Sequence, residues 1–276
     1  MKLALGVLVA VLVLVSLPML ASALLGRTFL YHPTRTSLEP LKTDGWQLAR
    51  IKAAAPDTRL VGLVRRAGDA DVPWLLFFGG NAMGLDANKW VLDRCAGGAP
   101  WGLATFAYRG YDGSDGQPTQ AALLADSEVI VQYLKETYSV TPERLVIVGQ
   151  SLGSGIAAHL AAHLQRNGTP PRALALMSPY TSIARVFDEQ VPIVPVGWLA
   201  PDPYPTDQLL GDLPAPILMI HGTADGLIPI QHSHDLKAAL GPRAELLALE
   251  GFEHNGLWED RRSTDAVRRL AVKRRP

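Results

Sequence analysis

Short apolar runs alternate with longer amphipathic stretches along most of this chain. The strand candidates, rich in Val, Leu and Ile, are residues 46–53, 59–65, 74–78, 103–108, 145–148, 173–177, 217–220 and 245–249. The helix candidates are residues 86–95, 119–138, 152–165, 231–240 and 258–272. Continuous apolar strands separated by amphipathic helices are typical of a mostly parallel sheet with helices on both faces. The pattern therefore predicts an α/β protein.

The alternation stops between residues 180 and 213. Prolines at positions 192, 195, 201, 203 and 205 prevent a long helix there. We expect residues 180–213 to form a small cap insertion, too short to enclose a substrate as a large lid does. Its apolar stretch, residues 191–199, is expected either to pack on the sheet edge or to form an acyl-binding or membrane-facing wall.

The N-terminus carries an uncharged, almost wholly apolar run, residues 3–25. This run reaches the roughly 20 residues that a membrane-spanning helix requires. Ala21-Ser22-Ala23 also resembles a signal-peptide cleavage site. We therefore expect residues 1–26 to be an uncleaved signal anchor, with a cleaved signal peptide as the alternative, and residues 27–276 to form the globular domain. The expected location is a single-pass membrane anchor with this domain outside the cytoplasm, or secretion after cleavage.

Composition narrows the class of protein further. A chain of 276 residues can form one large α/β domain. The formal net charge is +0, so no nucleic-acid footprint is predicted. Cys95 is the one cysteine, which excludes an intrachain disulfide and a cysteine-based metal site. The sequence predicts no oligomeric state.

The stretch with the most specific chemistry is Gly149-Gln150-Ser151-Leu152-Gly153. It lies between the strand candidate 145–148 and the helix candidate 152–165, which is the context of the G-x-S-x-G nucleophile elbow. Glycines on both sides let strand and helix approach closely while the apex residue is held in a strained conformation. We therefore predict Ser151 as a nucleophile, exposed at a helix N-terminus that favours developing negative charge.

A serine nucleophile needs a base that is itself oriented by a carboxylate. In folds with this elbow the chain order is Ser, then Asp or Glu, then His. Asp225 and His254 each follow a strand candidate, at the carboxyl edge where sites form in parallel sheets. We predict His254 as the base and Asp225 as its partner. The alternatives for the carboxylate are Asp202, Asp207 and Glu253.

The other histidines receive structural interpretations. His221 is expected to pack and hold the turn, and His232 and His234 are expected to face solvent. His159 and His163 have the i, i+4 spacing of a zinc helix but lack the glutamate of H-E-x-x-H, so no metal is expected.

Two backbone amides must face the substrate oxygen as an oxyanion hole. One is expected from Leu152, directly after the nucleophile. The other is expected from the glycine-rich loop 79–84, with Asn81 as the first candidate and Ala82 as the second. The loop has no Lys-Ser/Thr of a phosphate-binding loop.

These blocks together resemble those of α/β-hydrolase-fold serine hydrolases, and more narrowly the membrane-anchored α/β-hydrolase domain-containing protein family. The matching blocks, from about residue 27 to 258, begin at Phe29 (FLYHPTR), Gly79 (GGNA), Tyr108 (YRGYDGSDG), Gly149 (GQSLG), Ser178 (SPYTS), His221 (HGTAD) and Gly251 (GFEHN). The resemblance implies the α/β-hydrolase fold and an uncleaved N-terminal anchor. Gly79 replaces a histidine of the family, which we expect to loosen the oxyanion loop. Asp112 replaces a glycine, which we expect to put a carboxylate near the mouth of the site.

The sequence therefore predicts a membrane-associated serine hydrolase that cleaves carboxylic ester or thioester bonds through an acyl-enzyme on Ser151. The expected substrate is a small-molecule or lipid acyl ester, with no metal and no organic cofactor. Two alternatives stay open. They are a serine peptidase of the same fold and a catalytically silent binding protein on that fold.

Overall fold

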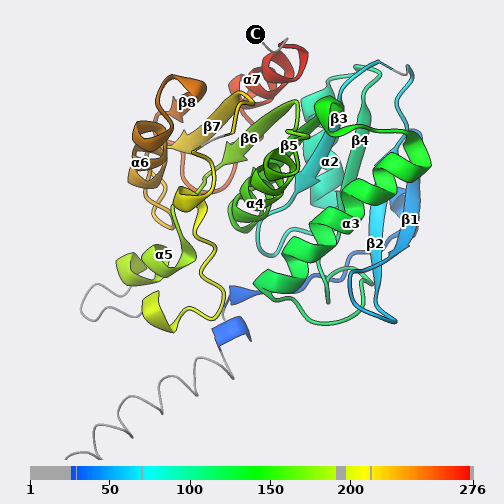
Figure 1. Ribbon diagram of the computed structural model, residues 1–276, viewed down its shortest axis with the longest axis horizontal. Helices are drawn as coiled ribbons and strands as arrows, with labels where there is room; N and C mark the ends of the chain where they lie inside the picture. Colours follow the sequence, from blue (N-terminus) through cyan, green and yellow to red (C-terminus); the bar gives the residue numbers. More distant parts are fainter. Residues whose placement is uncertain (1–25, 29, 70, 191–196, 212, 274–276) are drawn as a thin grey trace, which may run out of the picture.

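A single mostly parallel sheet organises the molecule (Figure 1). The computed structural model describes residues 26–28, 30–69, 71–190, 197–211 and 213–273. Its eight strands lie in the order β1-β2-β4-β3-β5-β6-β7-β8. Their bounds are β1 Trp46–Lys52, β2 Arg59–Arg65, β3 Trp74–Phe78, β4 Gly102–Phe106, β5 Leu145–Gln150, β6 Ala173–Met177, β7 Ile217–Gly222 and β8 Ala244–Leu249. Only β2 runs antiparallel to both neighbours, β1 and β4.

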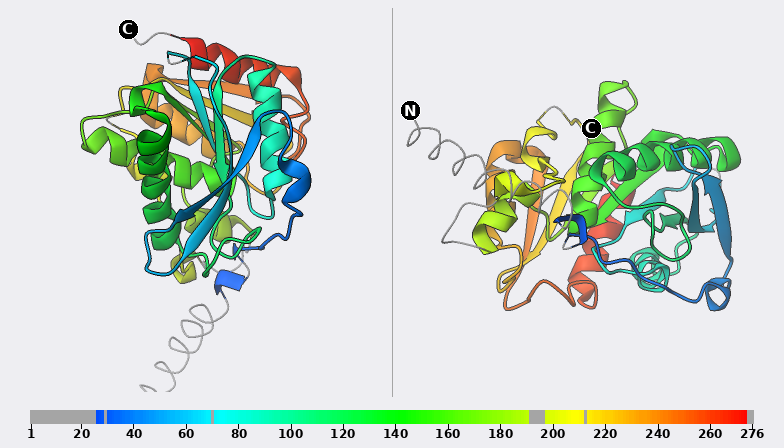
Figure 2. Two further views of the ribbon diagram at one scale, coloured as in Figure 1. Left: turned by 90° about the vertical axis from the view of Figure 1, so that its right-hand side faces the viewer. Right: turned by 90° about the horizontal axis from the view of Figure 1, so that it is seen from below.

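Helices cover both faces of this sheet. The helices that cover it are α2 (Leu85–Ala96), α3 (Gln120–Tyr138), α4 (Leu152–Arg166), α6 (Gln231–Leu240) and α7 (Arg261–Val272), whereas α5 (Ile183–Gln190) lies in the insertion beyond the end of the sheet. Short 3-10 turns are η1 (Glu39–Leu41), η2 (Pro142–Arg144), η3 (Gly197–Leu199), η4 (Thr206–Gln208) and η5 (Gly241–Arg243). Helices α2 and α7 pack together on one face, and α3 and α4 on the other (Figure 2).

Burial explains why the central strands are continuous apolar runs. Every residue of β3, β4, β5, β6 and β7 is buried, because helices cover both sides of these strands. The edge strands β1 and β8 contain exposed and half-buried positions as well as buried ones. The predicted mostly parallel α/β architecture is confirmed, with strand ends shifted by a few residues at most.

The predictions failed at two places in the helical pattern. The cap insertion contains a helix, α5, that the sequence did not reveal, because its prolines begin only after Gln190. The last helix begins at Arg261 rather than at residue 258. There Asp260 acts as the N-cap and accepts a hydrogen bond from the Arg262 amide at 2.7 Å.

The insertion between β6 and β7 packs at one end of the sheet, beside the N-terminal segment (Figure 1). Residues 191–196 of its apolar stretch lie outside the described residues. In the described remainder, the Trp198 side chain is 59% exposed. The predicted anchor in residues 1–25 also lies outside the described residues. Within the described ranges, no helix is both long and apolar enough to span a bilayer.

Candidate active site

Ser151 occupies the sharp turn between β5 and α4. Its backbone has φ +49° and ψ −119°, a conformation that costs energy for any residue with a side chain. The flanking glycines are required by space. A Cβ at Gly149 would collide with the Gly153 carbonyl, and a Cβ at Gly153 would collide with the Phe78 carbonyl. The geometry is that of a nucleophile elbow, and it holds the hydroxyl above the sheet edge.

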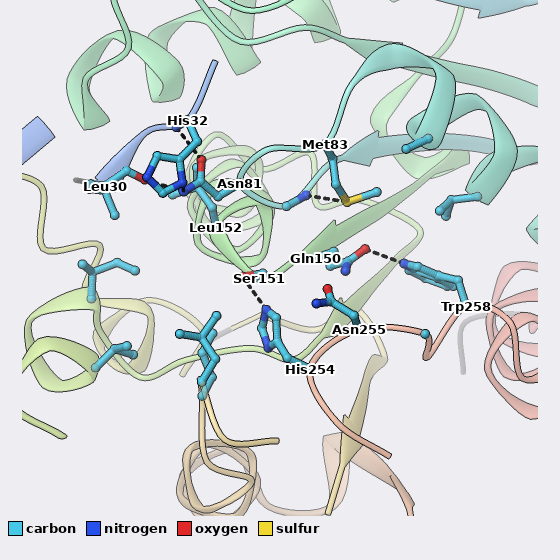
Figure 3. A pocket seen from close by; sticks show the side chains of 18 of the residues that line it. Leu30, His32, Asn81, Met83, Gln150, Ser151, Leu152, His254, Asn255 and Trp258 are labelled. Carbon is cyan, nitrogen blue, oxygen red and sulfur yellow. Dashed lines mark hydrogen bonds between the residues drawn. The ribbon is translucent and has the colours of Figure 1, made fainter. Parts of the chain in front are cut away.

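His254 joins Ser151 to Asp225 by two hydrogen bonds (Figure 3 shows the first). Its Nε2 lies 3.0 Å from Ser151 Oγ, and its Nδ1 lies 2.7 Å from Asp225 Oδ2. The loop after β8 carries His254 and the loop after β7 carries Asp225, so both reach the carboxyl edge of the sheet. Because the carboxylate can only accept, Nδ1 carries a proton and Nε2 is free to accept the serine proton.

Asp225 is held in its charged form. Its side chain is fully buried, and its Oδ1 accepts hydrogen bonds from the amides of Leu227 (3.0 Å) and Ile228 (2.8 Å). Burial alone would raise the pKa of this carboxyl group. Hydrogen bonds from His221, His254 and the Ile228 amide outweigh burial and hold the pKa well below its usual value. Asp225 therefore stays ionised across the neutral range and fixes the tautomer of His254.

His221 packs in the turn as the sequence predicted, but its contact with the carboxylate was missed. Its side chain is fully buried, and Nε2 lies 2.8 Å from the Ile228 carbonyl and 3.2 Å from Asp225 Oδ2. Its Nδ1 lies 2.7 Å from Ser233 Oγ. The sequence contained a signal for this contact, because His221 lies one residue before the end of β7 and four residues before the predicted acid.

The amides near Ser151 separate the two oxyanion candidates. Leu152 is the first residue of α4, so its N–H has no carbonyl one turn earlier. The backbone N–H of Asn81 has no hydrogen-bond partner among the described residues. The Ala82 amide, in contrast, donates to Asn81 Oδ1 at 3.1 Å. Because the side chain of the preceding residue already accepts from the Ala82 amide, Asn81 stays the first candidate for the second donor, and Ala82 stays the second candidate.

The two departures from the family pattern have structural roles that the sequence did not predict. Gly79 leaves room for Asn88, whose Oδ1 would collide with a Cβ at this position, and the Gly79 carbonyl accepts from Tyr108 Oη at 2.7 Å. The hydrogen bond from Tyr108 is a contact that holds the loop at Gly79, and the expected loosening stays a prediction. Asp112 is 3% exposed and accepts hydrogen bonds from the amides of Leu85 (2.6 Å) and Thr36 (2.7 Å). It caps α2 and does not line the mouth of the site.

A cavity of about 510 Å³ opens beside Ser151 (Figure 3). Helix α5 supplies one apolar wall through Ile183, Val186 and Phe187. Helix α2 and the loop before α7 supply another, which includes Val91 and Trp258. Most of its lining is carbon, with the triad and the elbow as the polar part, which suits an apolar ligand with one reactive polar group.

The competing carboxylates lie elsewhere. Asp202 is buried and accepts from Arg27 Nε (3.1 Å), Tyr31 Oη (3.0 Å) and the Gln120 amide (3.0 Å), so it ties the N-terminal segment to the insertion. Asp207 and Glu253 are exposed, and no described contact joins either to His254. Of the candidates considered, the structure brings only Asp225 to His254.

The interpretation of His232 was wrong. It is fully buried rather than solvent-facing, with Nδ1 3.1 Å from the Thr181 amide and Nε2 2.8 Å from Glu189 Oε2. His234 is exposed, as predicted. His159 bonds the Gly155 carbonyl at 2.9 Å and His163 lies 3.0 Å from Glu128 Oε1. Within the described residues no group of side chains has the composition of a metal site.

The sheet order, the elbow and the helices on both faces define an α/β-hydrolase fold. A family model described as "alpha/beta hydrolase fold" matches residues 116–194. The uncharacterized protein Rv2307c of Mycobacterium tuberculosis is 35% identical over 200 residues, which cover 72% of this chain and 69% of that protein. The uncharacterized protein YfhR of Escherichia coli K12 is 30% identical over 239 residues, which cover 84% and 81%. The chain belongs to the α/β-hydrolase family that these proteins share.

Solved structures show the same fold. The esterase Pf2001 of Pyrococcus furiosus superposes with a TM-score of 0.70 at 13% identity, covering 89% of this chain and 96% of that one. The resemblance to α/β-hydrolase-fold proteins that the sequence indicated is therefore confirmed.

Proposed function

We propose that this protein is a serine hydrolase that cleaves carboxylic ester or thioester bonds through an acyl-enzyme on Ser151. The observation that carries the proposal is the continuous hydrogen-bonded chain Ser151–His254–Asp225 at the edge of an apolar cavity. A strained serine, an oriented base and a buried carboxylate in this order activate a hydroxyl for attack on a carbonyl carbon.

The reaction follows from the positions of these groups. His254 Nε2 takes the proton from Ser151 Oγ as the oxygen attacks the substrate carbonyl. The resulting oxyanion is stabilised by the N–H groups of Leu152 and Asn81, which no described carbonyl occupies. Protonated His254 then gives its proton to the leaving alcohol or thiol. Water activated by the same histidine releases the acid and restores the serine.

The cavity supports an acyl substrate over a peptide. Its walls are mainly aliphatic and aromatic, and among the described residues that line it Glu259 is the one with an acidic side chain. A peptide backbone would need hydrogen-bond partners along its length, and the described lining offers few. The alternative of a catalytically silent binding protein explains none of the hydrogen bonds that orient His254.

We further propose that the enzyme acts at a membrane surface on a lipid or small-molecule acyl ester. Leu30 and His32, which follow the apolar run of residues 3–25, line the cavity. Trp90 and Leu227 line it as well and are 44% and 49% exposed. Large exposed apolar side chains around a cavity favour contact with an apolar surface. A catalytic domain outside the cytoplasm stays a prediction, which reporters fused to the C-terminus and active on one side of the membrane would test.

A substrate series tests the proposal. The full-length protein in detergent is assayed with p-nitrophenyl esters and acyl thioesters of increasing chain length and with a p-nitroanilide peptide. We expect kcat/KM to rise by roughly fourfold per added methylene that enters the cavity, because each contributes about 0.8 kcal/mol. Ser151→Ala should abolish turnover of every substrate. Hydrolysis of the anilide alone would overturn the ester and thioester assignment in favour of a peptidase.

A further inference from the structure

The side chain of Asn81 is at the centre of a hydrogen-bond cluster between the oxyanion loop and the N-terminal segment (Figure 3). Its Nδ2 donates to the Leu30 carbonyl at 2.7 Å and lies 3.2 Å from His32 Nδ1. Its Oδ1 accepts from the His32 amide at 2.9 Å. The Asn81 side chain therefore hydrogen-bonds to both Leu30 and His32, in the segment that follows the apolar N-terminal run.

The same Oδ1 also faces two donors of the domain itself. Tyr111 Oη donates to it at 2.9 Å and the Ala82 amide at 3.1 Å. Three donors surround one oxygen, and a carbonyl and a ring nitrogen face the amide nitrogen. This environment fixes which end of the carboxamide is oxygen, and it satisfies the whole group.

Fixing this side chain also fixes the backbone that carries it. The Asn81 amide is one of the two proposed oxyanion donors, and it lies in a loop where Ala82 adopts φ +58°. A loop with a left-handed residue keeps its shape only when its surroundings hold it. The bonds from Leu30, His32 and Tyr111 are the surroundings that the structure supplies.

We propose that the Asn81 side chain is a positioning residue for the oxyanion hole, and that the N-terminal segment Leu30–His32 is part of the active site through it. The inference rests on the proposed function, because it needs an oxyanion to be formed. Asn81 has two separate roles. Its backbone N–H meets the substrate oxygen, while its carboxamide aims that N–H by tying the loop to the N-terminal segment and to Tyr111.

The test compares Asn81→Ala, Asn81→Asp and Tyr111→Phe with wild type, in the full-length protein. Asn81→Asp keeps an acceptor for His32 and Tyr111 but places an oxygen against the Leu30 carbonyl. Tyr111→Phe removes one hydroxyl and keeps the buried ring. Tyr133→Phe, which removes a hydroxyl on α3 away from the cavity, is the matched control. Active sites are counted by fluorophosphonate titration, so misfolded protein does not enter kcat.

We expect kcat to fall roughly 10- to 100-fold in both Asn81 variants and less in Tyr111→Phe, because a misaimed oxyanion donor loses much of its effect. KM should change little. An alkyl trifluoromethyl ketone forms a tetrahedral adduct on serine. Its inhibition constant should rise by the same factor by which kcat/KM falls. A loss of global stability alone, with the loop correctly placed in the molecules that stay folded, would leave this affinity and kcat per titrated site unchanged.

The outcomes separate this inference from the proposed function. If wild type does not react with the fluorophosphonate, the serine hydrolase proposal fails and this one fails with it. If wild type reacts and the Asn81 variants keep wild-type kcat and ketone affinity per titrated site, the hydrolase stands and the positioning role is overturned.

Discussion

His221 Nε2 lies 3.2 Å from Asp225 Oδ2, the same carboxylate oxygen that lies 2.7 Å from His254 Nδ1. The Ile228 carbonyl lies 2.8 Å from the same nitrogen. Because both neighbours of Nε2 are acceptors, this nitrogen carries the proton of the ring. His221 therefore holds the carboxylate of Asp225, which in turn orients His254.

This contact makes His221→Gln a catalytic as well as a structural change. Loss of one buried hydrogen bond to a charged group costs about 1.5 kcal/mol or more, so we expect kcat to fall roughly 10-fold. Ser233→Ala is the matched control, since it removes the partner of Nδ1 at 2.7 Å and leaves the carboxylate untouched. Equal kcat values for the two variants would contradict a role of His221 at the carboxylate.

Replacing Asp225 by Asn should remove most activity. We expect a loss of roughly 10⁴-fold in kcat, because the amide stabilises the wrong tautomer of His254.

The pKa of Asp225 is lowered in the folded state, so its contribution to stability is present above the unfolded value of about 4 and is lost as the pH falls below it. As the pH is lowered from 6 to 3.5, the melting temperature of wild type should therefore fall more than that of Asp225→Asn. A difference that stays constant over this range would contradict the lowered pKa.

Asp112 should be a stabilising residue rather than a catalytic one. Asp112→Gly restores the residue of the family and relieves a φ of +42°, worth roughly 1 kcal/mol. It also removes the acceptor of the Leu85 and Thr36 amides, which costs about 1–3 kcal/mol for the buried Leu85 amide and less for the half-buried Thr36 amide. We expect a net loss in the free energy of unfolding in urea, with kcat per active site unchanged. A variant more stable than wild type would show that the strain outweighs the two bonds.

His232 should make the attachment of α5 sensitive to pH. Desolvation lowers the pKa of His232, while Glu189 raises it and Arg185 and His221 lower it further. The folded pKa lies below the unfolded one, so this contribution to stability is complete above about 6.5 and is lost as the pH falls from there towards the folded pKa. Protonated Nδ1 can no longer accept from the Thr181 amide at 3.1 Å, whereas Thr181 Oγ1, at 2.9 Å, can rotate its hydroxyl and accept from the new N–H.

We therefore expect hydrogen exchange in α5 to speed up between pH 7 and pH 5, after correction for intrinsic rates. In His232→Gln this additional change should be absent. The same acceleration in the variant would place the pH sensitivity at another group.

The sequence predicted those features of the fold and of the site that depend on residue type and local spacing along the chain. The elbow glycines, the strand-end positions of Asp225 and His254, and the buried runs of the central strands could all be predicted, because each depends on local pattern. The partners of Asn81 and Asp112 could not be predicted, since they come from residues 27 to 76 positions away that only the folded chain brings near. His232 was misjudged for the same reason, because Thr181 and Glu189 bury it from across the insertion.

The most direct test of the serine hydrolase proposal is labelling of the purified full-length protein with a fluorophosphonate, followed by intact-mass measurement. Ser151→Ala, His254→Ala and wild type are compared, with circular dichroism to show that each is folded. We predict one phosphonyl adduct on Ser151 of wild type, none on Ser151→Ala, and labelling of His254→Ala slowed by at least roughly 10²-fold, as expected for loss of a general base. Folded wild-type protein that takes up no label, or that is labelled at another residue, would contradict the account.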